Sequence, residues 1–106
     1  MTGSATTPQP PYYAVIFTSV RHDGDNGYSA AAGQMLALAA KQAGFLGFET
    51  ARQEIGISVS YWSTLEAIKV WKENTAHQQV QRHAKEWYKE FRVRVRVCRV
   101  EREYGF

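Results

Sequence analysis

The sequence predicts one α+β domain whose six elements follow the order β-α-β-β-α-β. Its length of 106 residues fits a single domain, and a hydrophobic content of 44% with 13% aromatic residues excludes disorder for most of the chain. Apolar positions change between a period of two and a period of three to four along the chain, as strands and helices require. Residues 1–11 contain three prolines and three threonines. They predict a disordered leader, so that the folded domain spans residues 12–106.

The first half of the domain is predicted to contain a strand, a helix and a hairpin. Residues 12–20 are β-branched and aromatic at both odd and even positions, which predicts a strand covered on both faces. Residues 45–52 and 56–62 are also strand-like and are joined by a short polar turn. Between the first strand and this hairpin, a helix is predicted that stops at Gly44, a residue suited to end a helix. That helix is indicated by residues at spacings of three and four: Tyr28, Ala31, Met35, Leu38 and Gln42.

The second half is predicted to contain a helix in two segments and a last strand. A capping box from Ser63 to Glu66 predicts the helix start, and a second box at Thr75 predicts a break near Asn74. The new segment carries an inward stripe with a repeat of three and four: His77, Val80, Ala84, Trp87 and Phe91. Valines and arginines then alternate over residues 92–97, which predicts the last strand. A β-bulge near Cys98 would explain the change of phase before Val100.

This order is the ferredoxin-like arrangement, in which an antiparallel sheet carries both helices on one face. The other face is expected to be too apolar to lie in water, because it draws on Val15, Phe17, Val59 or Ile57, and the valines of the last strand. A second copy of the same sheet would cover it economically. We therefore expect a homodimer that packs face to face through its sheets.

Composition excludes several classes of protein. The single cysteine, Cys98, excludes a disulfide framework and a multi-cysteine metal site. Arginines near Cys98 favour a lowered thiol pKa, although a lone cysteine in a terminal strand is typically inert. No apolar run approaches the roughly 20 residues that cross a bilayer, and the polar N-terminus is not a signal peptide. We therefore expect a cytoplasmic protein that does not engage a membrane.

Basic residues are concentrated near the C-terminus, where eight of the 13 lie between Arg82 and Arg102. This asymmetry raises the expectation of an anionic partner, but it is more typical of a solvated strand face with local ion pairs. The stripe of Arg92, Arg94 and Arg96 either pairs with glutamates of a partner subunit or faces solvent. Nucleic-acid binding is not expected. The segment 44–48 (GFLGF) resembles half of an RNA-recognition signature, but it lies on the second strand and lacks the initial basic residue.

Several motifs together resemble the antibiotic biosynthesis monooxygenase family, whose members are dimeric α/β barrels. The motifs begin with a Gly-Phe-Leu turn into the second strand and a third strand that ends in tryptophan before a Ser/Glu-capped helix. A second tryptophan and a histidine follow. Here they are Gly44, Phe45 and Leu46, then Trp62, Ser63 and Glu66, then Trp71 and His77.

The resemblance implies one pocket per subunit between the helices and the sheet. Family oxygenases that attack aromatic polyketides use no metal or organic cofactor, because the deprotonated substrate itself reacts with oxygen. Such chemistry needs aromatic walls, a proton acceptor and a group that stabilises the developing anion. His77 would accept the proton, and Arg82 or His83 would stabilise the anion. The walls would come from Trp62, Trp71, Tyr61, Tyr28 and Met35.

Two departures from the family pattern bear on the chemistry. Relatives that use an asparagine four residues before the strand tryptophan would carry it at position 58, where Ser58 retains a hydroxyl donor but no amide. The haem-degrading branch would place its iron ligand at position 81, which is Gln81, and neither His77 nor His83 points in that direction. We therefore expect no haem and no other cofactor. The alternative function is a dimeric domain that binds a small ligand, or another protein, without turnover.

Overall fold

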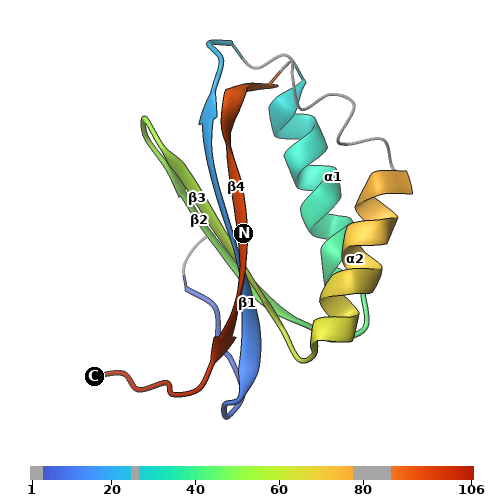
Figure 1. Ribbon diagram of the computed structural model, residues 1–106, viewed down its shortest axis with the longest axis vertical. Helices are drawn as coiled ribbons and strands as arrows, with labels where there is room; N and C mark the ends of the chain where they lie inside the picture. The colour runs from blue at the N-terminus through green and yellow to red at the C-terminus, as the bar shows by residue number, and fades with distance from the viewer. Residues whose placement is uncertain (1–3, 25–26, 78–86) are drawn as a thin grey trace.

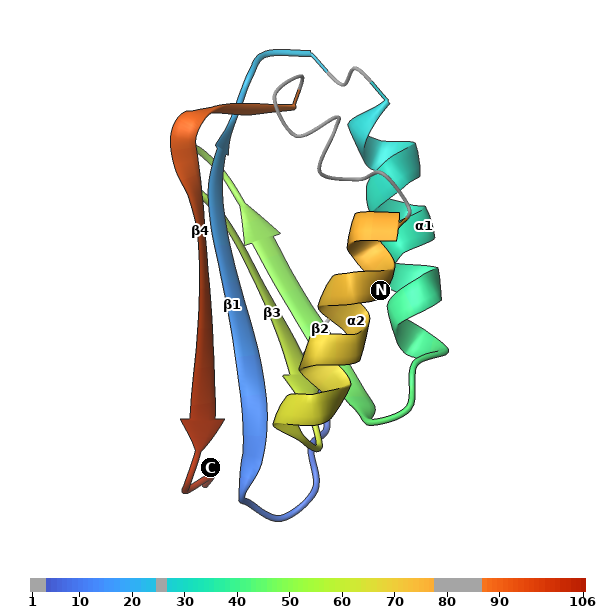
Figure 2. The ribbon, with the colours of Figure 1, turned by 45° about the vertical axis from the view of Figure 1, so that its right-hand side comes forward.

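The computed structural model describes residues 4–24, 27–77 and 87–106. Its order β-α-β-β-α-β confirms the predicted fold class (Figure 1). The four strands form an antiparallel sheet in the order β2-β3-β1-β4, and both helices cover the same face (Figure 2). The elements are β1 (Tyr12–Arg21), α1 (Tyr28–Ala40), β2 (Phe45–Arg52), β3 (Gly56–Trp62), α2 (Leu65–His77) and β4 (Tyr88–Val100). Neither helix is long and apolar enough to cross a membrane among the residues described.

Strand register decides which residues face the helices. On β1, Val15 pairs with Ser60 of β3, and Phe17 pairs with Ser58. Because side chains alternate along a strand, these residues share one face with Trp62, which is packed against the helices. The residues between them, including Tyr61, lie on the opposite face, which we call the outer face.

The core forms where α2 crosses the end of β3. Trp62 has no exposed surface and packs with the buried residues Ala39 and Ile68. Its indole Nε1 donates a hydrogen bond of 2.9 Å to the Ser60 hydroxyl, and its ring lies 5.4 Å from that of Phe45. A buried tryptophan with its N–H satisfied contributes a large apolar area without a desolvation cost.

The start of α2 differs by one residue from the predicted capping box. The Ala67 N–H donates to Thr64 Oγ1 at 3.0 Å, so Thr64 caps the helix, and the prediction of Ser63 as cap is wrong. The Ser63 N–H instead donates to the Gly44 carbonyl at 2.8 Å and ties the end of β3 to the segment after α1. The first helix was predicted to run to Gly44, but α1 ends at Ala40 with Lys41 as its C-cap, so that boundary is wrong. Gly44 has φ +86° and lies in the turn that leads into β2.

The predicted break near Asn74 is also wrong, because α2 runs through Asn74 to His77. Much of the predicted new segment lies outside the described residues, but β4 begins at Tyr88, so Phe91 belongs to a strand. The spacing of four between Trp87 and Phe91 was interpreted as helical, but residues four apart share a face in a strand as well as in a helix. The spacing therefore does not distinguish the two.

No bulge occurs near Cys98. The pairing of β1 with β4 is regular from Ser19–Val93 to Tyr12–Val100, and the irregularity lies at the other end, between Ser19 and Arg21. Cys98 therefore lies on the outer face with Arg94 and Arg96, and no phase correction is needed.

The same register corrects the predicted composition of the outer face. Val15, Phe17 and the valines at 93, 95 and 97 lie on the helix side, and only Val59 and Ile57 of the predicted set lie outside. Val95 and Val97 are 58% and 50% exposed on the helix side.

Residues 4–11 contain no helix or strand, yet they contact the outer face. The Ala5 N–H donates to Glu49 Oε2 of β2 at 3.0 Å. The Tyr12 hydroxyl donates to Glu103 Oε1 at 2.9 Å, and the Thr7 hydroxyl bonds to the same oxygen. A Cβ on Gly47 would lie 2.8 Å from the Ala5 methyl, so the leader approaches β2 closely. The domain boundary at residue 12 stays a prediction.

Candidate functional site

A cavity of about 250 Å³ lies between the two helices and the sheet. Its wall is mostly apolar, and four hydroxyl groups project from it among the described residues. Each helix and each strand contributes at least one lining residue. They are Val15, Phe17, Tyr28, Ala31, Ala32, Met35, Leu36, Ala39, Phe48, Ser58, Ser60, Trp71, Trp87 and Tyr88. An apolar hollow with a few polar groups is typical of a small-molecule site.

The floor of this helix-side cavity carries two serines of β3. Strand alternation brings Ser58 and Ser60 to the same face, as the register with β1 requires. Ser58 shares a hydrogen bond of 3.0 Å with the Thr50 hydroxyl, and Ser60 accepts the Trp62 indole N–H at 2.9 Å. Since Ser60 Oγ acts as an acceptor toward Trp62, its own O–H remains able to donate to a ligand.

Aromatic rings close one end of the cavity. Tyr28 at the start of α1 makes edge contacts with Trp87 and Tyr88, each with ring centroids 5.8 Å apart. Phe17 of β1 packs against Tyr88 at 5.6 Å. The His22 N–H donates to the Trp87 carbonyl at 2.9 Å, which fixes the start of β4 against the end of β1. Edge contacts of this kind hold the rings in place and leave some faces free to stack on a planar ligand.

The tyrosines at this end act as hydrogen-bond donors. Burial, followed by a hydrogen bond to Tyr28, raises the pKa of Tyr88, while Arg52 and Arg21 act in the opposite direction. The guanidinium carbon of Arg21 lies 3.7 Å from the centre of the Tyr28 ring. A phenol is protonated at neutral pH, and the raised pKa keeps Tyr88 protonated further into the alkaline range. Its hydroxyl can therefore donate to a substrate oxygen in place of its bond with Tyr28.

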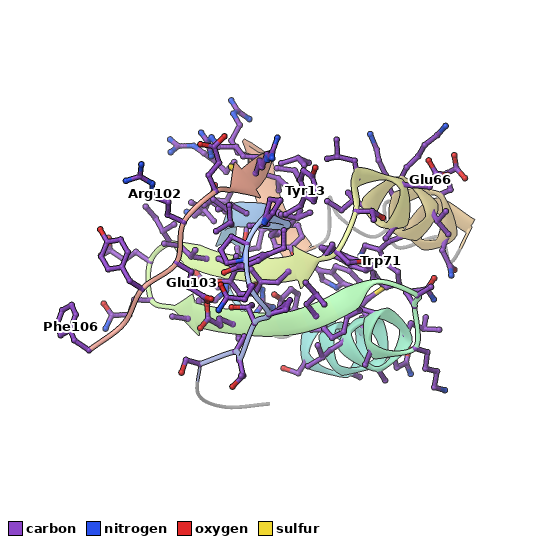
Figure 3. All side chains as sticks on the ribbon, turned by 90° about the horizontal axis from the view of Figure 1, so that it is seen from below. Tyr13, Glu66, Trp71, Arg102, Glu103 and Phe106 are labelled. Carbon is purple, nitrogen blue, oxygen red and sulfur yellow. The ribbon has the colours of Figure 1, made fainter. Side chains whose placement is uncertain are left out.

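Trp71 forms the wall on the α2 side. Its ring stacks on Trp62 with centroids 6.0 Å apart and planes inclined by 30°. Figure 3 shows Trp71 pointing from α2 toward the sheet, whereas Glu66 of the same helix points away from it. Trp62 supports this wall from behind and has no surface of its own in the cavity.

The structure thus brings together four residues predicted for the pocket: Tyr28, Met35, Ser58 and Trp71. It separates Tyr61 from them. Tyr61 lies on the outer face, where its hydroxyl donates to Glu49 and its ring packs against Tyr12 at 5.9 Å. The expectation that Tyr61 walls this pocket is corrected, because it neighbours Trp62 and adjacent residues of a strand point to opposite faces.

Three residues predicted for the chemistry cannot be placed in the cavity. His77 is the last residue of α2, and its side chain is not among those described. Arg82 and His83 lie outside the described residues. Among the described residues no group of three histidine, cysteine, aspartate or glutamate side chains is arranged to hold a metal ion.

Sequence reasoning missed several of the lining residues. Ser60 could have been predicted, since alternate residues of a strand share a face and Ser58 and Trp62 were already expected in the pocket. Phe17 was expected on the other face of the sheet. Tyr88 was missed because residues 87–91 fit a helical spacing, so the last strand was predicted to begin at residue 92 and not at Tyr88.

Comparison with known proteins now identifies the family. The family model described as "antibiotic biosynthesis monooxygenase" matches residues 11–83. The chain belongs to the antibiotic biosynthesis monooxygenase family. The uncharacterized protein YqjZ of Bacillus subtilis is 46% identical over 103 residues, covering 94% of this chain and 89% of YqjZ.

Solved structures show the same fold at low sequence identity. SnoaB of Streptomyces nogalater, described as a cofactor-independent oxygenase, superimposes with a TM-score of 0.68 at 9% identity, covering 91% of this chain and 97% of SnoaB. The PA3566 protein of Pseudomonas aeruginosa gives a TM-score of 0.68 at 12% identity, over 92% of this chain and 99% of its own. At these identities the likeness supports the fold alone.

Proposed function

We propose that this member of the antibiotic biosynthesis monooxygenase family oxidises a small aromatic substrate in the helix-side cavity, without metal or organic cofactor. The observation that carries the proposal is the partly open cavity itself, which combines aromatic walls with four hydroxyls. Its volume of about 250 Å³ lies just below the range of roughly 300–1,000 Å³ that is typical of ligand sites, and favours a substrate of few rings. The description of SnoaB as cofactor-independent supports the same chemistry.

The walls and hydroxyls have separate roles in this proposal. Trp71 and Phe17 offer ring faces or edges to a planar substrate from opposite sides, one from α2 and one from β1. Tyr88, whose pKa is raised by burial, donates to the substrate oxygen on which negative charge develops. Ser58 and Ser60 provide further donors at the floor, so that hydroxyls on two sides of the cavity stabilise the anion.

The proton acceptor is assigned to His77 and the cationic stabiliser to Arg82, with His83 as a further substrate contact. These roles come from the family resemblance and from the position of His77 at the end of α2, the helix that also carries Trp71. Once the substrate has lost a proton, its electron-rich carbon reacts with dioxygen. For an anthrone-type substrate a CH₂ group becomes a carbonyl: one oxygen atom enters the product, the other leaves as water, and the substrate supplies all the electrons.

Oxygen consumption by purified, metal-free protein with an anthrone-type substrate tests the proposal. We expect turnover by the wild type and a rate lower by about 10²-fold or more in His77→Ala, because a positioned general base contributes roughly that much. Lys72→Ala, an exposed residue of the same helix, is the matched control and should retain the rate. Equal rates in wild type and His77→Ala, with intact circular dichroism, would remove His77 from the mechanism.

One observation favours a second function, binding without turnover. Tyr28 and Tyr88 are the titratable side chains that line the cavity among the described residues, and the raised pKa of Tyr88 makes that hydroxyl a donor rather than a base. Absence of oxygen consumption together with a hydrophobic molecule that co-purifies would establish this alternative.

A homodimer that packs through the outer faces of its sheets belongs to the same proposal, as does a cytoplasmic location. Ile16 and Val59 are paired neighbours on the outer face, and Ile57 beside them is 46% exposed. This apolar strip lies next to the stripe of Arg94 and Arg96 on β4. Glu49, on β2 across the sheet, adds a negative charge to the same face, where its oxygens already accept hydrogen bonds from the Ala5 N–H and the Tyr61 hydroxyl. Sedimentation that finds only a monomer at micromolar concentration would contradict the dimer.

A further inference from the structure

A second hollow lies at one end of the sheet, outside the helix-side cavity. It is an open groove of about 790 Å³ among the described residues. Three segments meet there, namely the end of β1, the β2–β3 hairpin and the start of β4, and Figure 1 shows them at the same end of the molecule. We call it the basic groove because of the residues that line it: Val20, Arg21, His22, Asp23, Gly24, Arg52, Gln53, Glu54, Ile55, Lys89 and Arg92.

The charge in this groove is positive. Four cationic side chains face two carboxylates, those of Asp23 and Glu54, and His22 adds a further donor. Arg52 is held by hydrogen bonds to Ser19, to its carbonyl oxygen at 3.4 Å and to its hydroxyl. Arg21 donates to the Gly24 carbonyl at 3.1 Å. These bonds fix two of the positive charges on rigid strands, which is how a preorganised anion site is built.

The basic groove and the helix-side cavity meet at a few residues. Arg21 of the groove lies 3.7 Å from the ring centre of Tyr28, which lines the cavity, and Arg52 lies 5.9 Å from the same ring. Tyr88 of the cavity pairs with Arg21 across the strands and is followed directly by Lys89 of the groove. A ligand whose aromatic part occupies the cavity therefore has cationic side chains just beyond its aromatic end.

We infer that the substrate is an aromatic compound with an anionic substituent, a carboxylate, sulfonate or phosphate, that lies in the basic groove while the ring lies in the helix-side cavity. The inference rests on the proposed function for the location of the ring. Arg21 and Arg52 attract the anion from their fixed positions, and the exposed side chains of Lys89 and Arg92 contact it from β4. An oxyanion flanked by two or more cations gains charge-assisted hydrogen bonds that a neutral substituent lacks.

A pair of fluorescent probes separates the two parts of the ligand. Anilinonaphthalene sulfonate carries an aromatic part and an anion, and its uncharged parent phenylnaphthylamine carries the aromatic part alone. We expect Lys89→Gln/Arg92→Gln to weaken the binding of the sulfonate probe roughly fivefold or more, since partly exposed charge pairs each contribute modestly. The affinity of the uncharged parent should not change. Lys41→Gln/Lys69→Gln removes the same charge at two exposed positions that line neither the groove nor the cavity, and should change neither affinity.

Two further arms make the result specific to the groove and the cavity. Glu54→Gln removes a carboxylate from the groove and should strengthen the binding of the sulfonate probe by about twofold. Raising the ionic strength from about 0.02 M to about 0.5 M should weaken the binding of the sulfonate probe but not of its parent, because salt screens charge–charge attraction. Ala31→Phe introduces a ring into the helix-side cavity and should weaken both probes by similar factors.

The outcomes distinguish this inference from the proposed function. If both probes bind and Lys89→Gln/Arg92→Gln changes the affinity of neither, or Lys41→Gln/Lys69→Gln weakens binding of the sulfonate probe equally, the inference is overturned, while the cavity remains a site for aromatic compounds. If neither probe binds to folded wild-type protein, the cavity does not hold aromatic compounds, and the inference falls together with the proposed function.

Discussion

The ring of Trp71 stacks on that of Trp62 with centroids 6.0 Å apart and planes inclined by 30°. One ring lines the cavity and the other has no exposed surface. The pair therefore joins the hydrophobic core to the candidate site. Rigid support behind a binding surface reduces the entropy lost when a ligand binds.

Trp62→Ala should lower the free energy of unfolding by about 3–5 kcal/mol, because it removes a fully buried tryptophan and leaves a cavity. Urea denaturation followed by far-UV circular dichroism measures the change. Val70→Ala in α2 is the control, since Val70 is 48% exposed and its truncation should cost less than about 0.5 kcal/mol. Similar losses in the two variants would mean that Trp62 is not the centre of the core.

Two glycines should respond to alanine in opposite directions. Gly44 has φ +86°, and a Cβ there would lie 2.7 Å from the Ala67 methyl, so Gly44→Ala should destabilise the fold by about 1–3 kcal/mol. Gly33 lies in α1 with nothing within 4 Å of its Cβ position. Gly33→Ala should therefore stabilise by about 0.5–1 kcal/mol. Thermal unfolding of both variants checks the prediction, which fails if they shift the midpoint in the same direction.

The cap of α2 can be assigned by a second pair of substitutions. Thr64→Ala removes the acceptor of the Ala67 N–H and should cost about 1 kcal/mol. Ser63→Ala should cost little, because Ser63 contributes its backbone N–H, not its hydroxyl, to the Gly44 carbonyl. Denaturant titrations of the two variants decide the matter, and a larger loss for Ser63→Ala would restore the capping box predicted from the sequence.

Alkaline pH should weaken the fold through Tyr61. Burial, followed by the hydrogen bond to Glu49, raises the pKa of Tyr61 to about 12 from 10.0. The folded state therefore holds this proton more tightly than the unfolded state does. The resulting stability is complete below pH 10 and is lost as the pH rises toward 12. The difference in phenolate absorbance between wild type and Tyr61→Phe should show a late titration.

Glu49→Gln supplies the control for that titration. It removes the negative charge beside Tyr61 but retains an oxygen that accepts the hydrogen bond. The pKa of Tyr61 should fall part of the way toward the ordinary value, since burial remains. An unchanged titration in Glu49→Gln would leave burial as the whole cause.

Much of the fold could be predicted because the local signals agree. Residues 45–52 and 56–62 coincide with β2 and β3, since β-branched and aromatic residues there are bounded by turn residues. The signals conflict around residues 74–91. A capping motif inside α2 and a spacing of four that suits both helix and strand displaced the start of β4. Local propensity does not resolve such a conflict, because pairing with β1 decides it.

The sequence by itself determined the order of the elements, the pair of tryptophans and the concentration of positive charge near the C-terminus. It also determined that Tyr61 and Trp62 point to opposite faces, since neighbours in a strand always do. The tertiary structure alone decided which face each strand turns to the helices, because that depends on the register between strands distant in sequence. For the same reason it alone brought Tyr88 of β4 against Tyr28 of α1 and placed Arg21 and Arg52 beside them.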